Sequence, residues 1–300
     1  MKQHLRTIAF GLVLTALIAL LAETAWRDVR GKVVSAKREV MRFGFIDKSG
    51  AYVIEPEYEF ADDFSEGLAP VCIDGQFGYV DTQGAFAIEP AFSNAGPFNE
   101  GLAAVQLRGW IGYIDKTGSF IVPPRYERGG IFSDGLAPVA LAGKYGYINR
   151  SGEFVIRPDF RQAAPFSEGL ASVSRNRRVG YIDTMGKEVI PFQYSIAHPF
   201  TNGSARVYDG TNWKRIDKTG AVLEITPPPP TELPRGTGLQ PKKFANLWGF
   251  DDDAGAMIIP ATFHRAYPFQ DGLARVRIKT HVAEPGPVGA LDADPRGVVR

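Results

Sequence analysis

A period of 34 residues runs through most of this 300-residue chain and constrains its fold more than any other feature. Its clearest marks are two glycines six residues apart, the second of which ends a turn of the form Asp/Asn-x-x-Gly. The first glycine recurs at Gly44, Gly78, Gly112, Gly146 and Gly180, and the turn glycine at Gly50, Gly84, Gly118, Gly152, Gly186 and Gly220. A Gly-Leu-Ala tripeptide stands at Gly67, Gly101, Gly135, Gly169 and Gly272, and becomes Gly-Ser-Ala at Gly203. Such a period is typical of small units that bury their cores against their neighbours.

Each unit predicts three short β-strands. In one middle copy, an alternating run over 136–141 is followed by a returning segment at 145–148 and a third run at 154–156. The turn before the third run opens with an Asp or Asn whose side chain hydrogen-bonds to the turn, and ends with a glycine at positive φ. An alternative is that the turn acids of successive units bind a row of calcium ions. Each unit would then supply only one carboxylate, whereas a calcium ion takes roughly six to eight oxygen ligands. Turn chemistry is therefore the preferred interpretation, and we expect no metal site and no cofactor.

Two columns of aromatic residues are predicted to form the core. The first contains Tyr58, Phe92, Tyr126, Phe160, Tyr194 and Phe263, and the second contains Phe64, Phe98, Phe132, Phe166, Phe200 and Phe269. We expect each ring to stack on its equivalent in the next unit. Burial of one large side chain contributes about 1.5 to 3 kcal/mol, so stacking of the units would supply most of the stability.

The expected fold is therefore all-β: a tandem array of seven three-stranded units of ~34 residues in an open, twisted, solenoid-like stack. A seven-bladed β-propeller is the alternative, because seven is a typical number of blades. A propeller blade usually has four strands and about 40 to 50 residues. A short strand hidden in the connector between units would therefore favour the propeller.

The repeats define the predicted domain organisation. The β-repeat domain is expected over residues 32–278, with a proline-rich insertion at 227–241, and a disordered tail over 279–300. Residues 1–31 contain an uncharged run from Ile8 to Ala22 behind Lys2 and Arg6. That pattern is typical of a signal peptide or of an N-terminal membrane anchor, and both interpretations stay open. Either one predicts export to the periplasm or the cell exterior, and the anchor would attach the chain to the inner membrane through residues 8–22.

Three motifs recur together: G-[FY]-[IV]-[DN]-x-x-G, I-x-P-x-[FY] and F-x-[ED]-G-L-A-x-V. Through them, the chain from Gly44 to Ile278 resembles the bacterial WG-repeat family, also called KWG repeats. The Trp-Gly dipeptide that names the family is present only at Trp248 and Gly249. The resemblance implies repeated β units in envelope, secreted or modular proteins, with no shared catalytic residues.

Composition and motifs favour binding over catalysis. The 34 basic and 33 acidic residues nearly cancel, so no nucleic-acid partner is expected. The four histidines are isolated, no catalytic motif appears, and the single cysteine, Cys72, lies in an apolar run typical of a small core residue. We therefore expect a non-catalytic repeat scaffold at the cell envelope that binds a protein or an envelope polymer. The alternative is a carbohydrate or cell-wall binding module.

Six residues are candidates for the binding surface. Arg175, Arg177 and Arg178 crowd into one predicted hairpin tip, and Lys144 occupies the position of Arg178 one unit earlier. If neighbouring tips lie side by side, they form a basic patch suited to an anionic polymer or to lipid headgroups. Trp110 and Trp213 lie outside the two aromatic columns and are the candidate sugar-binding surface.

Overall fold

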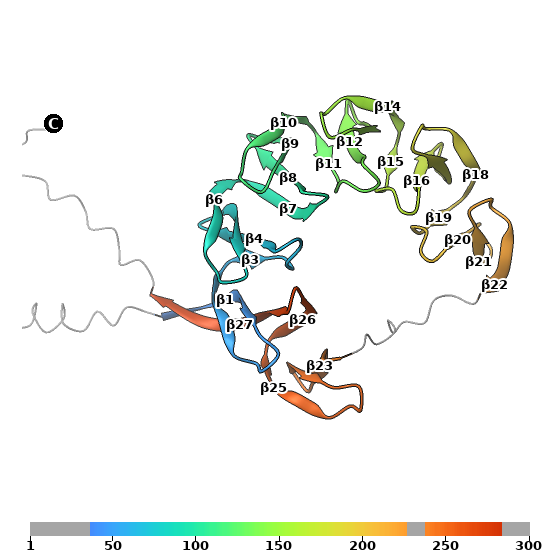
Figure 1. The fold of residues 1–300 in the computed structure, drawn as a ribbon. Coiled ribbons are helices and arrows are strands. Elements are labelled where there is room, and N and C mark those ends of the chain that lie inside the picture. Colours follow the sequence, from blue (N-terminus) through green and yellow to red (C-terminus); the bar gives the residue numbers. More distant parts are fainter. Residues whose placement is uncertain (1–36, 227–237, 284–300) are drawn as a thin grey trace, which may run out of the picture. The chain divides into compact units, whose positions relative to one another are not determined.

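The computed structural model describes residues 37–226 and 238–283, in which every regular element is a β-strand (Figure 1). Residues 41–278 form one compact unit, to which the packing described below belongs. Across the described ranges, no helix is long and apolar enough to cross a membrane. The predicted signal or anchor segment lies outside these ranges.

The strands form seven antiparallel sheets, which we number 1 to 7. Sheet 1 contains β3 (Phe60–Ala61), β4 (Leu68–Ile73), β5 (Gln76–Asp81) and β6 (Phe86–Phe92). Sheet 2 contains β7 (Asn94–Asn99), β8 (Leu102–Leu107), β9 (Trp110–Ile114) and β10 (Phe120–Tyr126). Sheet 3 contains β11 (Arg128–Gly129), β12 (Ala137–Leu141), β13 (Lys144–Ile148) and β14 (Phe154–Phe160). Sheet 4 contains β15 (Gln162–Ala163), β16 (Leu170–Arg175), β17 (Arg178–Asp183) and β18 (Glu188–Tyr194). Sheet 5 contains β19 (Ile196–Ala197), β20 (Ser204–Tyr208), β21 (Trp213–Asp217) and β22 (Val222–Thr226). Sheet 6 contains β23 (Gln240–Phe244), β24 (Leu247–Asp251) and β25 (Met257–Phe263).

Sheet 7 combines strands from opposite ends of the described chain. Its order is β26 (Arg265–Gln270), β27 (Leu273–Ala283), β1 (Lys37–Ile46) and β2 (Tyr52–Tyr58), so the first and last strands are neighbours. Strand β27 continues past Ile278, where we expected the repeat domain to end. Strand β23 likewise begins inside the expected proline-rich insertion, of which residues 227–237 lie outside the described ranges.

The prediction of three strands per unit was wrong, because six of the seven sheets have four. The additional strand comes from the connector, where a short segment such as Gln162–Ala163 pairs with the strand that follows the Gly-Leu-Ala motif. In four of these six sheets the additional strand has only two residues, which are too few to show an alternating pattern. The all-β prediction is confirmed, but the strand count no longer favours a solenoid-like stack over propeller-type sheets.

Both aromatic columns are buried, except that Phe269 is only partly covered. The predicted stacking of equivalent rings was wrong for both columns. In the first column, Tyr58 meets Phe86 of the next sheet instead of its equivalent there, with ring centroids 6.3 Å apart. Each phenylalanine of the second column packs on an aromatic ring of the preceding sheet, as Phe166 does on Tyr147 with ring centroids 4.7 Å apart. The hydroxyl of Tyr147 donates a 2.7 Å hydrogen bond to the carbonyl oxygen of Ala164, which satisfies a polar group that would otherwise be buried alone. The same bond is made by Tyr79, Tyr113 and Tyr181.

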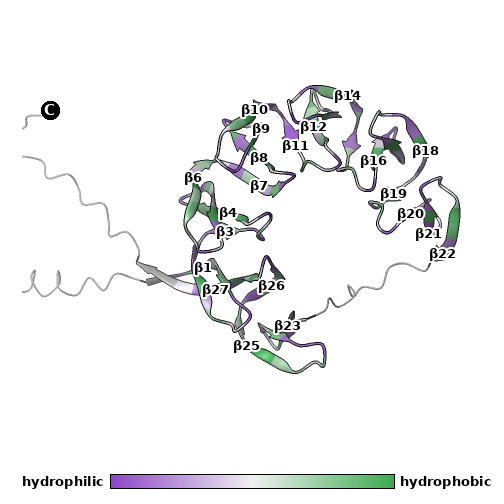
Figure 2. Cartoon of the chain, viewed as in Figure 1, coloured by the Kyte–Doolittle hydropathy of each residue, from purple (hydrophilic) through white to green (hydrophobic). Residues whose placement is uncertain are grey.

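Six hydrophobic clusters join neighbouring sheets, and their members give the packing order 6, 7, 1, 2, 3, 4, 5. Hydrophobic residues lie along the strands (Figure 2), and successive side chains point to opposite faces of a sheet, so Tyr79 enters one cluster and Val80 another. Loop acids add a bond at most junctions: the Gly203 N–H donates to Glu168 at 3.0 Å, and the Gly67 N–H donates to Asp271 at 3.1 Å. Within the described ranges, no hydrophobic cluster contains side chains of both sheet 5 and sheet 6.

The first glycine of the repeat makes room for an irregular outer strand. A Cβ atom on Gly180 would lie 2.6 Å from the carbonyl oxygen of Ile190, closer than real Cβ contacts. The register shifts at this point, because Val179 pairs with Tyr194 whereas Tyr181 pairs with Ile190. The glycine therefore permits a bulge in the outermost strand, in which Pro191 lies.

Candidate functional site

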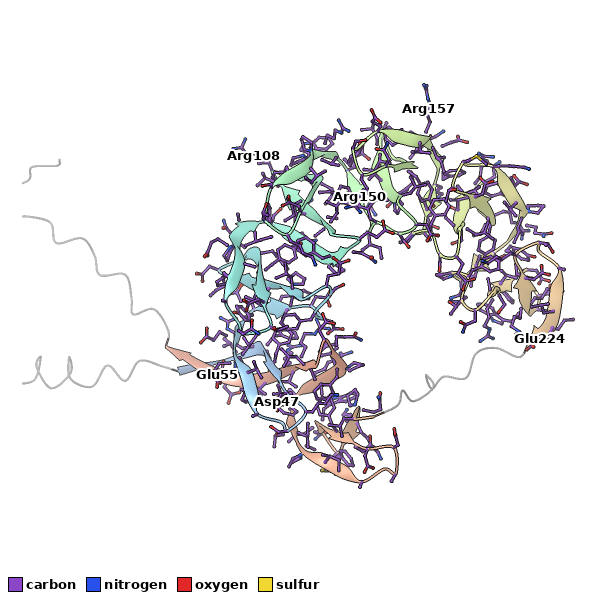
Figure 3. The ribbon with its side chains drawn as sticks, in the orientation of Figure 1. Asp47, Glu55, Arg108, Arg150, Arg157 and Glu224 are labelled. Atoms are coloured by element: carbon purple, nitrogen blue, oxygen red, sulfur yellow. The ribbon has the colours of Figure 1, made fainter. Side chains whose placement is uncertain are left out.

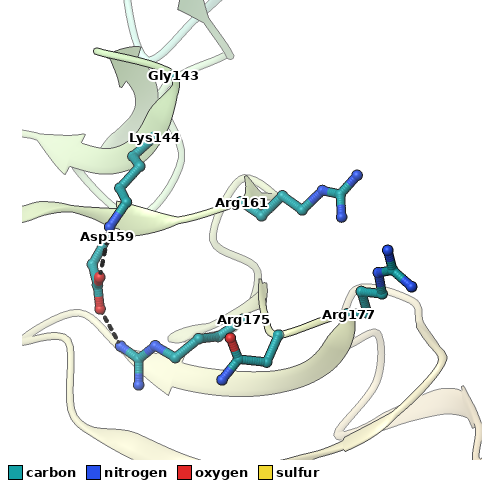
Figure 4. A pocket seen from close by; sticks show the side chains of 7 residues that line it. Gly143, Lys144, Asp159, Arg161, Arg175 and Arg177 are labelled. Carbon is teal, nitrogen blue, oxygen red and sulfur yellow. Dashed lines mark hydrogen bonds and ion pairs between the residues drawn. The ribbon is translucent and has the colours of Figure 1, made fainter.

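The hairpin tips of sheets 3 and 4 enclose a hollow of about 770 Å³ on the surface (Figure 4). Its lining contains Lys144, Arg161, Arg175 and Arg177, with Asp159 as the single acid. Four cations and one carboxylate leave a net of three positive charges in this hollow. The chain as a whole carries only +1, so the hollow is a local concentration of positive charge.

Asp159 connects the two sheets. Its Oδ2 accepts a hydrogen bond of 2.6 Å from Nη2 of Arg175, and its Oδ1 lies 3.4 Å from Nζ of Lys144. The Arg175 guanidinium, with a smaller effect of Lys144, lowers the pKa of Asp159 below its ordinary value. The carboxylate is therefore ionised at neutral pH and neutralises part of the charge of both cations.

The guanidinium group of Arg175 lies over two aromatic rings. Its guanidinium carbon lies 5.3 Å from the ring centre of Phe160 and 5.0 Å from that of Phe192. These two rings are themselves stacked, with centroids 6.5 Å apart and planes inclined by 22°. Cation–π contact on two rings and the bond to Asp159 fix the orientation of Arg175.

Arg161 and Arg177 replace a contact that other sheets make at the same place. In sheet 3, the Gly143 N–H at the hairpin tip donates a 3.0 Å hydrogen bond to Glu127 in the connector. The equivalent positions in sheet 4 carry Arg177 and Arg161, so a glycine–acid contact has been exchanged for two cations. Arg177 adopts a φ of 62°, a left-handed conformation that favours glycine.

The backbone N–H of Arg161 donates to the carbonyl oxygen of Ser174 at 2.9 Å, but the guanidinium groups of Arg161 and Arg177 make no hydrogen bond or ion pair with another residue of the described chain. Figure 4 shows both guanidinium groups on the side of the hollow away from Asp159. A guanidinium presents several N–H donors in a planar fork that matches carboxylate and phosphate oxygens. The hollow therefore combines two positioned cations with two that are available to an anion.

The other predicted surface residues lie apart from this hollow. Nη1 of Arg178 donates to the carbonyl oxygen of Gln193 at 3.2 Å, and Arg178 does not line the hollow. Trp110 is 47% exposed at the start of β9 in sheet 2. Trp213 in sheet 5 is half-buried and packs against Tyr208 with ring centroids 5.4 Å apart. The two tryptophans therefore lie on sheets that are not neighbours.

The structure brings the candidate residues Lys144, Arg175 and Arg177 into one hollow, and it adds Arg161 and Asp159, which the sequence analysis did not name. A signal for Arg161 was present, because the residue after the first aromatic column is Glu59, Ser93, Glu127, Arg161, Ser195 or His264, and only one of these is an arginine. Asp159 carried no such signal, because its role depends on the distance between two sheets.

A representative turn acid and the single cysteine have environments that agree with their structural interpretations. In the turn of sheet 2, Oδ1 of Asp115 accepts the Thr117 hydroxyl at 2.6 Å and the Ser119 N–H at 3.0 Å, as predicted for turn chemistry. Burial raises the pKa of the Cys72 thiol, which disfavours the reactive thiolate. Within the described ranges, no three His, Cys, Asp or Glu side chains are grouped so that they could hold a metal ion.

Comparison with solved structures finds chains of low sequence identity. Hsv2p of Kluyveromyces lactis is 10% identical with a TM-score of 0.40, and the match covers 55% of this chain and 62% of that one. A eukaryotic initiation factor is 12% identical with a TM-score of 0.39, covering 77% and 76% of the two chains. A TolB-like protein from Agrobacterium tumefaciens is 13% identical with a TM-score of 0.35, covering 63% and 88%.

No curated protein matches the chain. The family model for the WG containing repeat, however, matches six times, at residues 43–76, 77–109, 111–145, 145–177, 180–213 and 248–279. These matches cover more than half of the chain and coincide with the repeats found from glycine spacing. The chain therefore belongs to the WG-containing repeat family.

Proposed function

We propose that this protein is a non-catalytic binding scaffold that holds an anionic segment of a protein or polymer partner in the hollow between sheets 3 and 4. The observation that carries the proposal is the pair Arg161 and Arg177, which are positioned in the hollow without an internal anion. Bidentate arginine contacts to carboxylate or phosphate are among the stronger polar contacts in proteins. The neighbouring Arg175 and Lys144 add positive charge that is only partly neutralised by Asp159.

The site of action that we propose is the cell envelope. The uncharged run from Ile8 to Ala22 is the support for this proposal, because it has the composition of a signal peptide or an anchor. Anionic polymers and lipid headgroups are abundant partners in that setting. A carbohydrate-binding module is less well supported, because Trp110 and Trp213 lie on sheets that are not neighbours and the Arg206 guanidinium lies over the ring of Trp213.

For the arrangement of the repeats, we propose an open series of propeller-type sheets that is interrupted between sheets 5 and 6. The support is the packing order of the six hydrophobic clusters, which begins at sheet 6 and ends at sheet 5. In this arrangement the ends of the series lie within the sequence, on either side of residues 227–237, whereas the two ends of the described chain share sheet 7.

A binding measurement on the purified full chain tests the function. Fluorescently labelled polyglutamate and polyphosphate should both bind the wild-type protein, and the affinity should fall steeply with added salt. The variant Arg161→Glu with Arg177→Gly installs the residue types that sheet 3 carries at Glu127 and Gly143, so it is expected to fold. Loss of two cations and gain of one acid should weaken binding at least tenfold, or about 1.4 kcal/mol.

A matched control changes the charge by the same three units away from the hollow. Arg108→Gly removes a tip cation from sheet 2, and Lys187→Glu reverses a charge in the turn of sheet 4. This control should bind both polyanions with nearly wild-type affinity. Equal weakening in both double variants would show that only net charge matters and would refute the hollow as the binding site.

A further inference from the structure

The outermost strand of sheet 5, β22, lacks the feature that protects the outermost strands of the other sheets. Those strands all contain proline, at Pro56, Pro90, Pro123 and Pro124, Pro158, Pro191 and Pro260. Proline removes a backbone donor, and it occurs at sheet edges where it prevents another strand from pairing. Strand β22 has the sequence VLEIT, without proline.

The pairing of β22 is also more regular than that of its equivalents. Trp213, Lys214 and Arg215 pair one to one with Thr226, Ile225 and Glu224. In sheet 4, the register shifts at the equivalent of Lys214, which is Gly180. Sheet 5 has therefore lost the glycine, the bulge and the proline together, and its last three strand residues form an unbroken edge.

This regular edge is apolar and accessible. Val222 and Leu223 are each 50% exposed, and Ile225 is 67% exposed. Strand β22 stands last in its sheet, and no strand within 37–226 or 238–283 pairs with its other side. Its outward backbone groups are thus available to a further strand, flanked by apolar side chains.

We infer that β22 is a docking edge to which an extended segment of another protein adds as an antiparallel strand. Main-chain hydrogen bonds would supply much of the affinity, and side chains opposite Leu223 and Ile225 would supply selectivity. This surface is separate from the basic hollow, and the inference does not depend on the proposed function.

Glu224 determines the kind of segment that fits. In the two-fold antiparallel pairing of β22 with a second copy that uses all five residues, Glu224 would lie opposite the same glutamate. Like charges opposite each other destabilise a sheet, so a second copy fits poorly. The carboxylate of Glu224, a residue labelled in Figure 3, already accepts a hydrogen bond from Arg215 at 2.6 Å. A cationic residue opposite Glu224, between two apolar residues, complements this edge.

A synthetic peptide provides the probe. The labelled sequence Ser-Thr-Val-Lys-Val-Thr-Ser should bind the full-length protein in fluorescence anisotropy, and its binding should slow hydrogen exchange of the amides of 222–226. The same peptide with alternate backbone nitrogens methylated should not bind, because it lacks the donors that pair with β22. Equal binding of the two peptides, or no binding of the first, would overturn the inference.

Matched lysine variants locate the binding edge. Leu223→Lys and Val155→Lys change residues at equivalent positions, three after the turn glycine, and both are about half exposed. Leu223→Lys should bind the peptide at least about tenfold more weakly, since a lysine blocks edge pairing and repels the cationic peptide. Val155→Lys lies in a strand with proline and should bind as the wild type does.

Two further measurements keep the outcome clear. Ile225→Lys repeats the test at the most exposed of the three apolar side chains, and thermal unfolding checks that each variant folds. Light scattering measures the oligomeric state without peptide. A dimer that dissociates in Leu223→Lys would show that a second copy occupies the edge, which would overturn the assignment to a foreign segment.

Discussion

Sheets 4 and 5 share the repeat pattern, yet the faces that they turn toward the next sheet differ in chemistry. The face of sheet 4 contributes Leu170, Tyr181 and Ile190, all buried against sheet 5. The equivalent residues of sheet 5 are Ser204, Arg215 and Glu224, and the last two form an ion pair of 2.6 Å. One face is a core surface, and the other has the polar character of a cap at the end of a repeat array.

The opposite face of a sheet, which packs against the preceding sheet, differs in the same way between sheets 5 and 6. In sheet 5, this face contains Ala205, Val207 and Ile216, which are buried against sheet 4. Sheet 6 carries Gln240, Lys242 and Asp251 at the equivalent positions, and Nζ of Lys242 lies 2.7 Å from Oδ2 of Asp251. The polar residues on both of these faces are consistent with the proposed interruption between sheets 5 and 6.

The largest effect is expected when the face of sheet 4 is given the residues of sheet 5. Tyr181→Arg with Ile190→Glu places two charges in an apolar interface and removes the hydrogen bond from Tyr181 to the carbonyl oxygen of His198. We expect a loss of at least about 4 kcal/mol in the free energy of unfolding, measured by urea denaturation.

Hydrogen exchange localises that loss. Because sheet 5 would no longer be held by sheet 4, amides in 196–226 should exchange faster while those of sheets 1 and 2 stay protected. Unchanged protection of sheet 5 would mean that the cluster between sheets 4 and 5 does not hold it in place.

The repeat pattern, the end face of sheet 5 and the basic hollow differ in how far the sequence alone could predict them. The repeat, the turns and the buried columns were predictable, because glycine and aromatic residues recur at fixed positions and their local chemistry suffices. The Arg215–Glu224 pair was visible only as a departure from the pattern, and its meaning requires the opposing face. The contact of Asp159 with Arg175 was not predictable, because it depends on how two neighbouring sheets are placed. The two-residue connector strands of sheets 1, 3, 4 and 5 were missed for a third reason, because two residues have no measurable period.

A smaller effect is expected from the reverse exchange at the end face. Arg215→Tyr with Glu224→Ile gives sheet 5 the residues of sheet 4. The ion pair is largely exposed and contributes at most about 1 kcal/mol, so the unfolding free energy should change little. The new apolar patch should instead cause association that rises with protein concentration, measurable by light scattering. A large gain in stability without association would indicate that sheets 5 and 6 close on each other, contrary to an interrupted series.

The smallest effect is expected in the turns, which have the same hydrogen bonds in sheets 2 and 5. Donation from the Thr117 hydroxyl, with the N–H groups of Ser119 and Thr117, lowers the pKa of Asp115 in sheet 2 below 3.8. Thr219 lowers that of Asp217 in sheet 5 in the same way.

These shifts predict how stability depends on pH. Because the pKa is lower in the folded protein, the turn contributes fully to stability above the pKa of the unfolded chain, and this contribution is lost as pH falls through the pKa of the folded protein. Asp115→Asn should therefore reduce the fall in melting temperature below about pH 4. The turn itself should survive, because Asn149 in sheet 3 accepts the Ser151 and Glu153 N–H groups at 3.1 and 2.9 Å. Asp217→Asn should reduce the acid sensitivity by a similar amount. A much larger effect in sheet 5 would show that the end of the series weakens its turns as well as its outward face.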